Sequence, residues 1–249
     1  AGMVTRFKQS ERIGLLAGGN NVNSPGFSFG NQRLQFGGNN RSFGGGQGII
    51  TSNNYGLNYI NTFGKIFEFS GDYFYKNSES DNKSSSNRET FLSDGSSFFR
   101  NSENTSLNDS DSNDASIDFE IEIDSTFRID IETDFNRNLN TNRFNSESQT
   151  LNNSKTLTNN SKIESIADSN RERFDNEINI TKKFGDRGSF FRAELTANLK
   201  KTVTDDFVKS ETNIYGANPE QIIRDQYSDG NSDIKELVSE FTYRFPIKS

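Results

Sequence analysis

The sequence predicts an all-β fold, in which antiparallel strands run up and down to build part of a barrel wall. Three observations predict it. Apolar and polar residues alternate with a period of two, and aromatic residues are abundant. The segments that connect the alternating stretches are short and long by turns along the chain, so that a short connection is followed by a long one. A strand places every second side chain on one face, whereas a helix would spread the same apolar residues around its circumference.

The clearest alternation lies between residues 117 and 135. From Ile117 to Asp124 every odd position is apolar and every even position is acidic, and the pattern resumes from Phe127 to Phe135. The break at residues 124–126 predicts a tight turn between two antiparallel strands. Further alternating segments occupy residues 3–7, 13–17, 55–59, 67–75, 174–180, 191–199 and 237–245, so that about nine strands are expected.

The connections between these segments differ in length. Residues 8–11, 61–65, 124–126 and 184–188 predict short turns, and residues 20–48, 77–115, 138–164 and 202–233 predict long loops rich in Asn, Ser, Asp and Gly. The Gly/Asn-rich segment 18–48 is expected to form a partly ordered surface loop. Alternation of short periplasmic turns with long extracellular loops is typical of outer-membrane barrels.

The composition favours the same class of protein. Only 30% of the residues are hydrophobic and the mean hydropathy is −0.84, which by itself would indicate disorder. However, the chain has 23 Phe and 7 Tyr but only 3 Pro, which is unlike a disordered segment. A transmembrane barrel reconciles these numbers, because its apolar residues face lipid while its lumen and outer loops are polar. Aromatic residues near the strand ends fit an interfacial girdle, with cross-strand aromatic pairing as the alternative.

The alternation assigns side chains to two sides of the wall. The residues expected to face lipid are Phe69, Tyr73, Phe119, Ile121, Ile129, Ile131, Leu195 and Phe241. The residues expected to face the lumen are Glu68, Asp118, Glu120, Glu122, Asp130, Glu132, Arg192, Glu194 and Glu240.

Several segments resemble a known family. They are residues 12–23 (RIGLLAGGNNVN), 25–30 (PGFSFG), 48–51 (GIIT), 55–59 (YGLNY) and 65–82. These segments are similar to outer-membrane β-barrels of the TonB-dependent receptor superfamily, and more narrowly to those with an N-terminal carboxypeptidase-regulatory-like domain. The resemblance implies a location in the outer membrane of a Gram-negative bacterium, with the loops facing the cell exterior.

Members of that superfamily carry a periplasmic plug and a TonB-contacting segment before the barrel, and neither has a counterpart in this sequence. No functional residue is therefore carried over from the family. Ala1 begins partway along a strand pattern and Ser249 follows one. We therefore expect residues 1–249 to be part of a single barrel domain, with the plug domain and the remaining strands absent.

Catalytic chemistry has little support in the sequence. The chain has no His and no Cys, and it contains no phosphate-binding loop motif, so we expect no catalytic, cofactor or metal site and no enzyme activity. The carboxylates of the 117–135 hairpin (Asp118, Glu120, Glu122, Asp124, Asp130, Glu132 and Asp134) are expected to share one face, with Arg128 as the main counter-charge and further pairing to Arg192, Lys200 or Arg244. The main interpretation is a solvated lumen wall; the alternatives are a cation-attracting path and acid-base catalysis.

Two other ligands were weighed against the sequence. Residues 108–114 offer hard oxygens for calcium, but a flexible polar loop is the preferred interpretation because the glycine and distant glutamate of an EF-hand are missing. Nucleic acid is not expected as a partner, since the sequence pI is about 4.9 and no basic stripe is visible.

Two functions are the main candidates for this sequence. The first is import of a bulky nutrient across the outer membrane, with lipid, TonB and a surface lipoprotein as partners; it is implied by the resemblance. The second is a barrel that acts as a scaffold in an outer-membrane assembly or secretion complex. A third, a β-solenoid adhesin, requires a fixed short repeat that the sequence lacks.

Overall fold

The computed structural model describes residues 2–21, 49–185 and 188–245, and it is all-β. Nine strands make one sheet: β1 (Gly2–Lys8), β2 (Glu11–Asn20), β3 (Ile49–Phe63), β4 (Phe67–Phe91), β5 (Ser97–Asp124), β6 (Phe127–Leu151), β7 (Leu157–Phe184), β8 (Ser189–Ile214) and β9 (Glu220–Arg244). The expected number of strands is therefore confirmed. No helix occurs in the described ranges, and so none there is long and apolar enough to cross a membrane.

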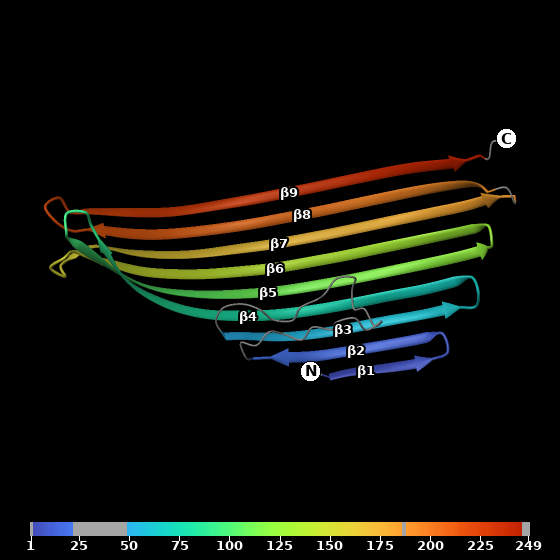
Figure 1. Ribbon diagram of the computed structural model, residues 1–249, viewed down its shortest axis with the longest axis horizontal. Helices are drawn as coiled ribbons and strands as arrows, with labels where there is room; N and C mark the ends of the chain where they lie inside the picture. Colours follow the sequence, from blue (N-terminus) through green and yellow to red (C-terminus); the bar gives the residue numbers. More distant parts are fainter. Residues whose placement is uncertain (1, 22–48, 186–187, 246–249) are drawn as a thin grey trace.

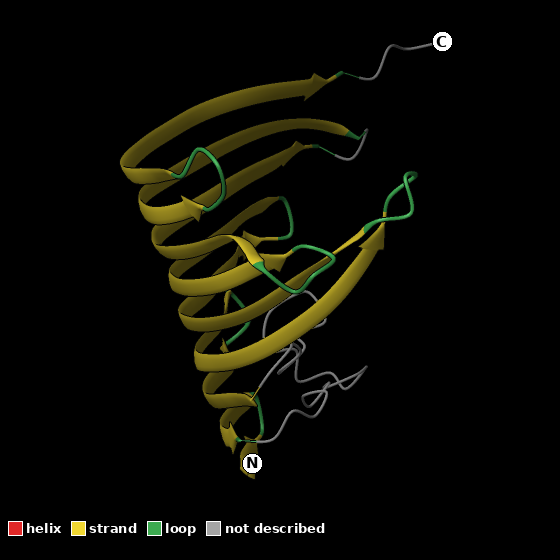
Figure 2. Ribbon diagram, turned by 90° about the vertical axis from the view of Figure 1, so that its left-hand side faces the viewer, coloured by secondary structure: helices red, strands yellow, loops and turns green. Residues whose placement is uncertain are grey.

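The strands follow one another across the sheet in sequence order, and every neighbouring pair is antiparallel. Figure 1 shows β1 to β9 side by side, with the chain reversing at each end. The sheet is not closed: it curves, and β1 and β9 form its two opposite edges (Figure 2). The up-and-down topology predicted from the alternation is confirmed to this extent.

The expectation of long loops is wrong for three of the four segments. Residues 77–115 lie mostly in β4 and β5, residues 138–164 in β6 and β7, and residues 202–233 in β8 and β9. Each pair of strands continues in register through these segments, for example from Asn77 opposite Asp111 to Asn87 opposite Asn101. The fourth segment, 20–48, lies outside the described residues from position 22 onward, and so does most of the Gly/Asn-rich segment 18–48, whose residues 18–20 belong to β2.

These segments look like loops in the sequence because side-chain alternation and backbone hydrogen bonding do not cover the same length of a strand. Alternation of apolar and polar residues reveals a strand only where one face is apolar. Beyond that part both faces carry Ser, Asn and Asp, so the sequence looks like a loop. The backbone amides and carbonyls nevertheless pair with those of the neighbouring strand, which satisfies them as fully as in the two-faced part.

Among the described residues, the turns are short at both ends of the sheet. At the end near residues 9–10, 64–66 and 125–126 the turns are very tight, and Gly64 adopts φ 69° there. We call this the short-turn end and the opposite end the far end. At the far end Asp94 accepts hydrogen bonds from the hydroxyl and amide of Ser96, which hold the pKa of Asp94 below its ordinary value. Asn152 accepts amide hydrogen bonds from Ser154 and Thr156 in the next far turn.

The sheet has almost no core of its own. In the described residues the buried apolar side chains are Leu16, Ile50 and Phe74. The chain exposes 17081 Å² of surface, against roughly 11,000 Å² for a compact soluble protein of this mass. Apolar burial within the described part of the sheet is therefore small.

Hydrogen exchange tests the extent of the strands. We expect backbone amides of residues 98–115 and 139–150 to be as strongly protected as those of residues 117–123, because all donate to the same ladders. Residues 92–96 and 152–156 should exchange fast and serve as the internal control. Exchange of residues 98–115 at the rate of these turns would show that the strands end early.

Candidate functional site

Side chains line up in rows that run across the sheet, because the strands stay in register from one end to the other. Phe69 lies opposite Phe119, Phe119 opposite Ile131, Ile131 opposite Ile178, and Ile178 opposite Leu195. We call the face with this row face 1. Face 2 is the opposite face, on which Glu68, Glu120, Asp130 and Asn179 lie in one row.

The register separates the two groups of residues that the sequence assigned to opposite sides. Phe69, Tyr73, Phe119, Ile121, Ile129, Ile131, Leu195 and Phe241 all lie on face 1. Glu68, Asp118, Glu120, Glu122, Asp130, Glu132, Arg192, Glu194 and Glu240 all lie on face 2. No register shift occurs between these positions; the two irregularities lie next to turns, at Glu122/Asp124 and Thr150/Leu151.

An apolar band covers face 1 near the short-turn end. We define it as the four rows of β4 to β9 that run from the row of Phe67 to the row of Tyr73. Four polar side chains fall within it: Thr133, Asn176, Lys235 and Ser239. The Asn176 amide donates a hydrogen bond of 2.6 Å to the Thr133 hydroxyl, so two of the four satisfy each other.

Aromatic rings border the band at both ends. On the short-turn side the next row contains Phe127, Phe191 and Tyr243, with the Lys182 ammonium 5.3 Å from the Phe127 ring. On the far side the last row contains Tyr73, Phe135 and Phe174. From Phe127 to Phe135 the strand rises by eight residues, or about 26 Å.

The tyrosines of the far border orient their hydroxyls toward polar side chains beyond the band. Tyr73 donates a hydrogen bond of 2.7 Å to Asn113, and Tyr75 in the following row donates one of 2.8 Å to Asp111. Their rings therefore complete the apolar band while their polar tips reach the adjoining rows. This amphipathic placement is what an apolar–aqueous boundary selects for.

The band is exposed, since no other part of the described chain covers it. Exposed fractions are 42% for Tyr73, 39% for Leu195 and 68% for Phe241. At the usual strand spacing and rise, the six strands and four rows of the band cover about 29 Å by about 26 Å, so its area is about 750 Å². Soluble monomers rarely expose a contiguous apolar patch of that size. An exposed patch as large as this one marks a surface that contacts another apolar surface.

Face 2 carries carboxylates at the level of the band. Three successive rows of β4 to β9 hold five, three and four acidic side chains and no basic one. They are Glu68, Glu120, Asp130, Glu194 and Glu240, then Asp118, Glu132 and Glu177, then Asp72, Asp134, Asp175 and Glu236. We call these three rows the carboxylate belt.

Basic side chains adjoin the belt on both sides; the sequence analysis named Arg128, Arg192 and Lys200 among them and missed Arg173. Arg128 and Arg192 share the next row on the short-turn side, and Arg173 and Lys200 share the next row on the far side. Arg173 pairs with Asp175, two residues along the same strand. The signal in the sequence was the spacing: a basic residue two positions from an acidic one on a strand lies on the same face.

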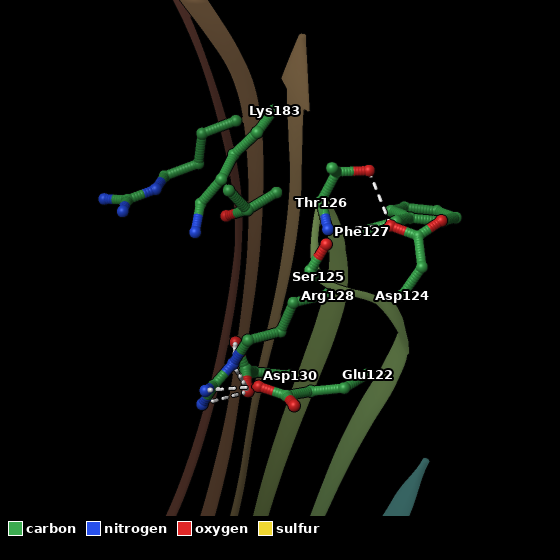
Figure 3. A pocket seen from close by; sticks show the side chains of 10 residues that line it. Glu122, Asp124, Ser125, Thr126, Phe127, Arg128, Asp130 and Lys183 are labelled. Atoms are coloured by element: carbon green, nitrogen blue, oxygen red, sulfur yellow. Dashed lines mark hydrogen bonds and ion pairs between the residues drawn. The ribbon is translucent and has the colours of Figure 1, made fainter. Parts of the chain in front are cut away.

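Arg128 is the counter-charge that the sequence predicted. Its guanidinium lies 2.9 Å from Glu120, 2.8 Å from Asp130 and 3.6 Å from Glu122. A hollow of about 430 Å³ opens beside it on face 2, lined also by Lys183 and Arg192 (Figure 3). The predicted pairing of other carboxylates with Arg192, Lys200 or Arg244 is not found among the described residues.

Asp124 departs from the predicted acidic face. The register shift between Glu122 and Asp124 places Asp124 opposite Phe127, and its carboxylate accepts hydrogen bonds from the hydroxyl and amide of Thr126. Figure 3 shows Asp124 and Phe127 on the opposite side of the hairpin from the Arg128 guanidinium. The Asp124 carboxylate is therefore hydrogen-bonded within the turn. The other six carboxylates that were expected to share one face all lie on face 2.

Toward the far end, face 2 becomes nearly uncharged and its side chains small. β4 contributes Ser78, Ser80, Asn82, Ser84 and Ser86, and β5 contributes Ser102, Asn104, Ser106, Asn108 and Ser110. β6, β7 and β8 continue the same rows mostly with Ser, Asn and Thr, interrupted by Phe144, Ile163, Asp206 and Val208. Face 2 is therefore divided into a charged zone beside the band and a neutral hydrogen-bonding zone beyond it.

The segment considered for calcium is part of this sheet. Residues 108–114 lie within β5, so the expected flexible loop is wrong there. In a strand, neighbouring side chains point to opposite faces and cannot converge on one ion. Across the described residues, no group of three or more acidic side chains could hold a metal ion.

Comparisons with known proteins leave the family open: no family model, no curated protein and no solved structure matches the chain.

Removing the charge of Arg128 tests its role beside the carboxylate belt. We expect Arg128→Gln to lower the unfolding free energy by about 1 kcal/mol at neutral pH, because three carboxylates lose a shared but solvent-exposed partner. Urea titration measures this loss.

Arg137→Gln is the matched control, since Arg137 has one carboxylate partner, Glu172 at 3.3 Å. It should cost less than Arg128→Gln. Equal losses for the two variants would show that the three-carboxylate arrangement adds nothing.

Proposed function

We propose that this chain is part of the wall of an outer-membrane β-barrel that imports a bulky nutrient. The observation that carries the proposal is the apolar band of face 1, bordered by aromatic rings and backed by the carboxylate belt of face 2. Face 1 would contact lipid and face 2 would line the lumen.

The dimensions of the band support a lipid contact. The apolar zone of an outer-membrane barrel is about 25 Å tall and flanked by aromatic girdles, and the band rises about 26 Å along the strand between its bordering aromatic rows. A barrel strand needs only about 9–11 residues to cross the bilayer. The strands β4 to β9 have 25 to 28 residues, so most of each strand would stand outside the lipid.

The position of the band along the strands supports an orientation. At the short-turn end the strands reach at most about four residues past the band, whereas at the far end β5 continues about 18 residues beyond Ala115 and β6 about 16 residues beyond Phe135. We place the short turns in the periplasm, as the sequence suggested, and the far end outside the cell. The outer part is a tall β-wall instead of the long loops that were expected.

A wide lumen would suit the transport of something bulky. Barrels of about eight strands are filled by side chains, whereas those of 16 or more enclose a channel or a plug. Nine strands of this sheet remain open, and the small Ser and Asn side chains of the outer part of face 2 leave space. The resemblance to TonB-dependent receptors adds import as the function, with TonB and a surface lipoprotein as partners.

The alternative is a scaffold in an outer-membrane complex without transport. The tall outer wall favours it, because such a wall offers a large surface to neighbouring proteins. Both functions share the lipid-facing assignment and differ in what the rest of the protein contains.

Substitution on face 1 tests the lipid contact. Phe119→Arg should lower the unfolding free energy in vesicles by about 2–4 kcal/mol, since the charge would lie near the bilayer midplane. Thr105→Arg is the matched control: it lies on the same strand and the same face, beyond the band, and should cost little. Glu120→Gln should also cost little, and a larger loss for it than for Phe119→Arg would mean that the two faces are reversed.

Peptide mapping of the protein from its native outer membrane separates import from scaffolding. Import predicts peptides from a plug-like domain upstream of Ala1, together with uptake that stops when TonB is removed. An intact mass of 28.1 kDa would rule out the importer, because this chain contains no plug. An upstream region without a plug would favour the scaffold.

A further inference from the structure

The outer part of face 1 carries a second row of apolar side chains, separated from the band. Ile49, Leu107, Ile166, Phe207 and Tyr227 lie in one row on β3, β5, β7, β8 and β9, which Asp81 on β4 and Arg143 on β6 interrupt. We call it the apolar row. Ile49 is 69% exposed and Tyr227 66%, and even the central Phe207 is 37% exposed. Single exposed apolar residues are ordinary, but five at one level of an otherwise polar wall form a surface feature.

An acidic row lies between the apolar row and the band. Glu79, Asp109, Asp168, Asp205 and Asp229 occupy one row of face 1 across β4, β5, β7, β8 and β9. The apolar row lies eight residues past Phe135, or about 26 Å along the strand. It is therefore outside the level at which lipid chains would contact the wall.

Hydrogen bonds fix the side chains where the two rows meet. The Tyr227 hydroxyl donates a hydrogen bond of 2.6 Å to Asp205, which raises the pKa of Tyr227 above its ordinary value. Arg143 interrupts the apolar row and lies 3.2 Å from Asp109. The surface is thus ordered before any partner binds, which reduces the entropy lost on binding.

The charge of this surface selects the chemistry of a partner. The two rows and the row on either side of them contain nine carboxylates and three basic side chains, Lys83, Arg143 and Lys209. The excess of six negative charges repels anionic lipid, and it opposes a second copy of the chain that would present the same carboxylates. A protein with basic side chains around an apolar strip fits.

The area is sufficient for a stable complex. From β3 to β9 the four rows span about 29 Å by about 26 Å, or about 750 Å². A standard protein–protein interface buries about 800 Å² on each partner, with apolar residues at its centre and polar ones at its rim. The apolar row lies at the centre of this surface and the carboxylates lie around it.

We propose that the outer part of face 1 is a docking surface for a basic protein partner, centred on Ile166, Phe207 and Tyr227. This surface requires only that face 1 is the outside of the wall, and it does not depend on what passes through the lumen. The partner would attach to the side of the wall beyond the lipid, and its Lys and Arg residues would meet Asp168, Asp205 and Asp229.

Site-specific cross-linking in the native membrane tests the proposal. A photo-reactive benzoylphenylalanine replaces Phe207 in the full-length protein, and in the matched control it replaces Val208, the next residue, whose side chain lies on face 2. We expect a protein cross-link from position 207 and not from position 208. Absence of a protein cross-link at position 207, or a cross-link to a second copy of the chain, would overturn the proposal.

The partner that the cross-link identifies is then purified, and its binding to this protein tests whether the carboxylates of the acidic row attract it. The triple variant Asp168→Asn, Asp205→Asn and Asp229→Asn should bind this partner more weakly. We expect its dissociation constant to rise by about tenfold or more at physiological salt, and the difference from the unaltered protein should shrink at 1 M salt. Unchanged hydrogen exchange in β7 to β9 would show that the variant is folded.

The control variant neutralises three carboxylates of one row on face 2, through Glu120→Gln, Asp130→Asn and Glu194→Gln. Its affinity should stay the same. An affinity that is equal in both triple variants would overturn the docking surface. Phe119→Arg tests separately whether face 1 contacts lipid. Failure of the docking surface can therefore be distinguished from failure of the lipid contact.

Discussion

The continuous hydrogen-bonded register of the sheet is the constraint on which every other feature depends. A shift of one residue in any strand would move its whole set of side chains to the opposite face. From β4 to β9 the register holds for more than twenty residues, with irregularities only beside turns. The apolar band, the carboxylate belt and the acidic row each exist because of this alignment, since each is assembled from only a few residues of any one strand.

The same wall presents four different surfaces because composition changes along the strand as well as across it. On β5, Phe119 and Ile121 lie in the apolar band and Asp118 and Glu120 lie in the carboxylate belt behind it. Farther along, Leu107 and Asp109 occupy face 1, while Ser106 and Asn108 occupy the neutral zone of face 2. A fixed backbone thus carries separate chemistries at separate levels. The proposed lipid contact and the proposed protein contact lie on one face without overlapping.

Charge is organised to keep the carboxylate belt compatible with a folded sheet. Like charges opposite each other on neighbouring strands destabilise a sheet, and Glu120, Asp130 and Glu194 belong to one such row. Arg128 and Arg173, at the two borders of the belt, each pair with a carboxylate two residues away on their own strand. Solvent screens what remains, as the exposed fractions of these groups allow: 45% for Arg128 and 41% for Glu120.

The sequence by itself determined the two-faced part of the wall. Strict alternation from Ile117 to Phe135 identified the β5–β6 hairpin, its turn and the division of Phe119 from Glu120, because one apolar face makes the period of two visible. Only the tertiary structure decided where the strands end. In Ser102 to Ser110 both faces are polar apart from Leu107, so no periodicity distinguishes strand from loop, and pairing with β4 and β6 supplies the missing information. For the same reason the apolar row could not be foreseen: its five residues lie on five strands and meet only through the register.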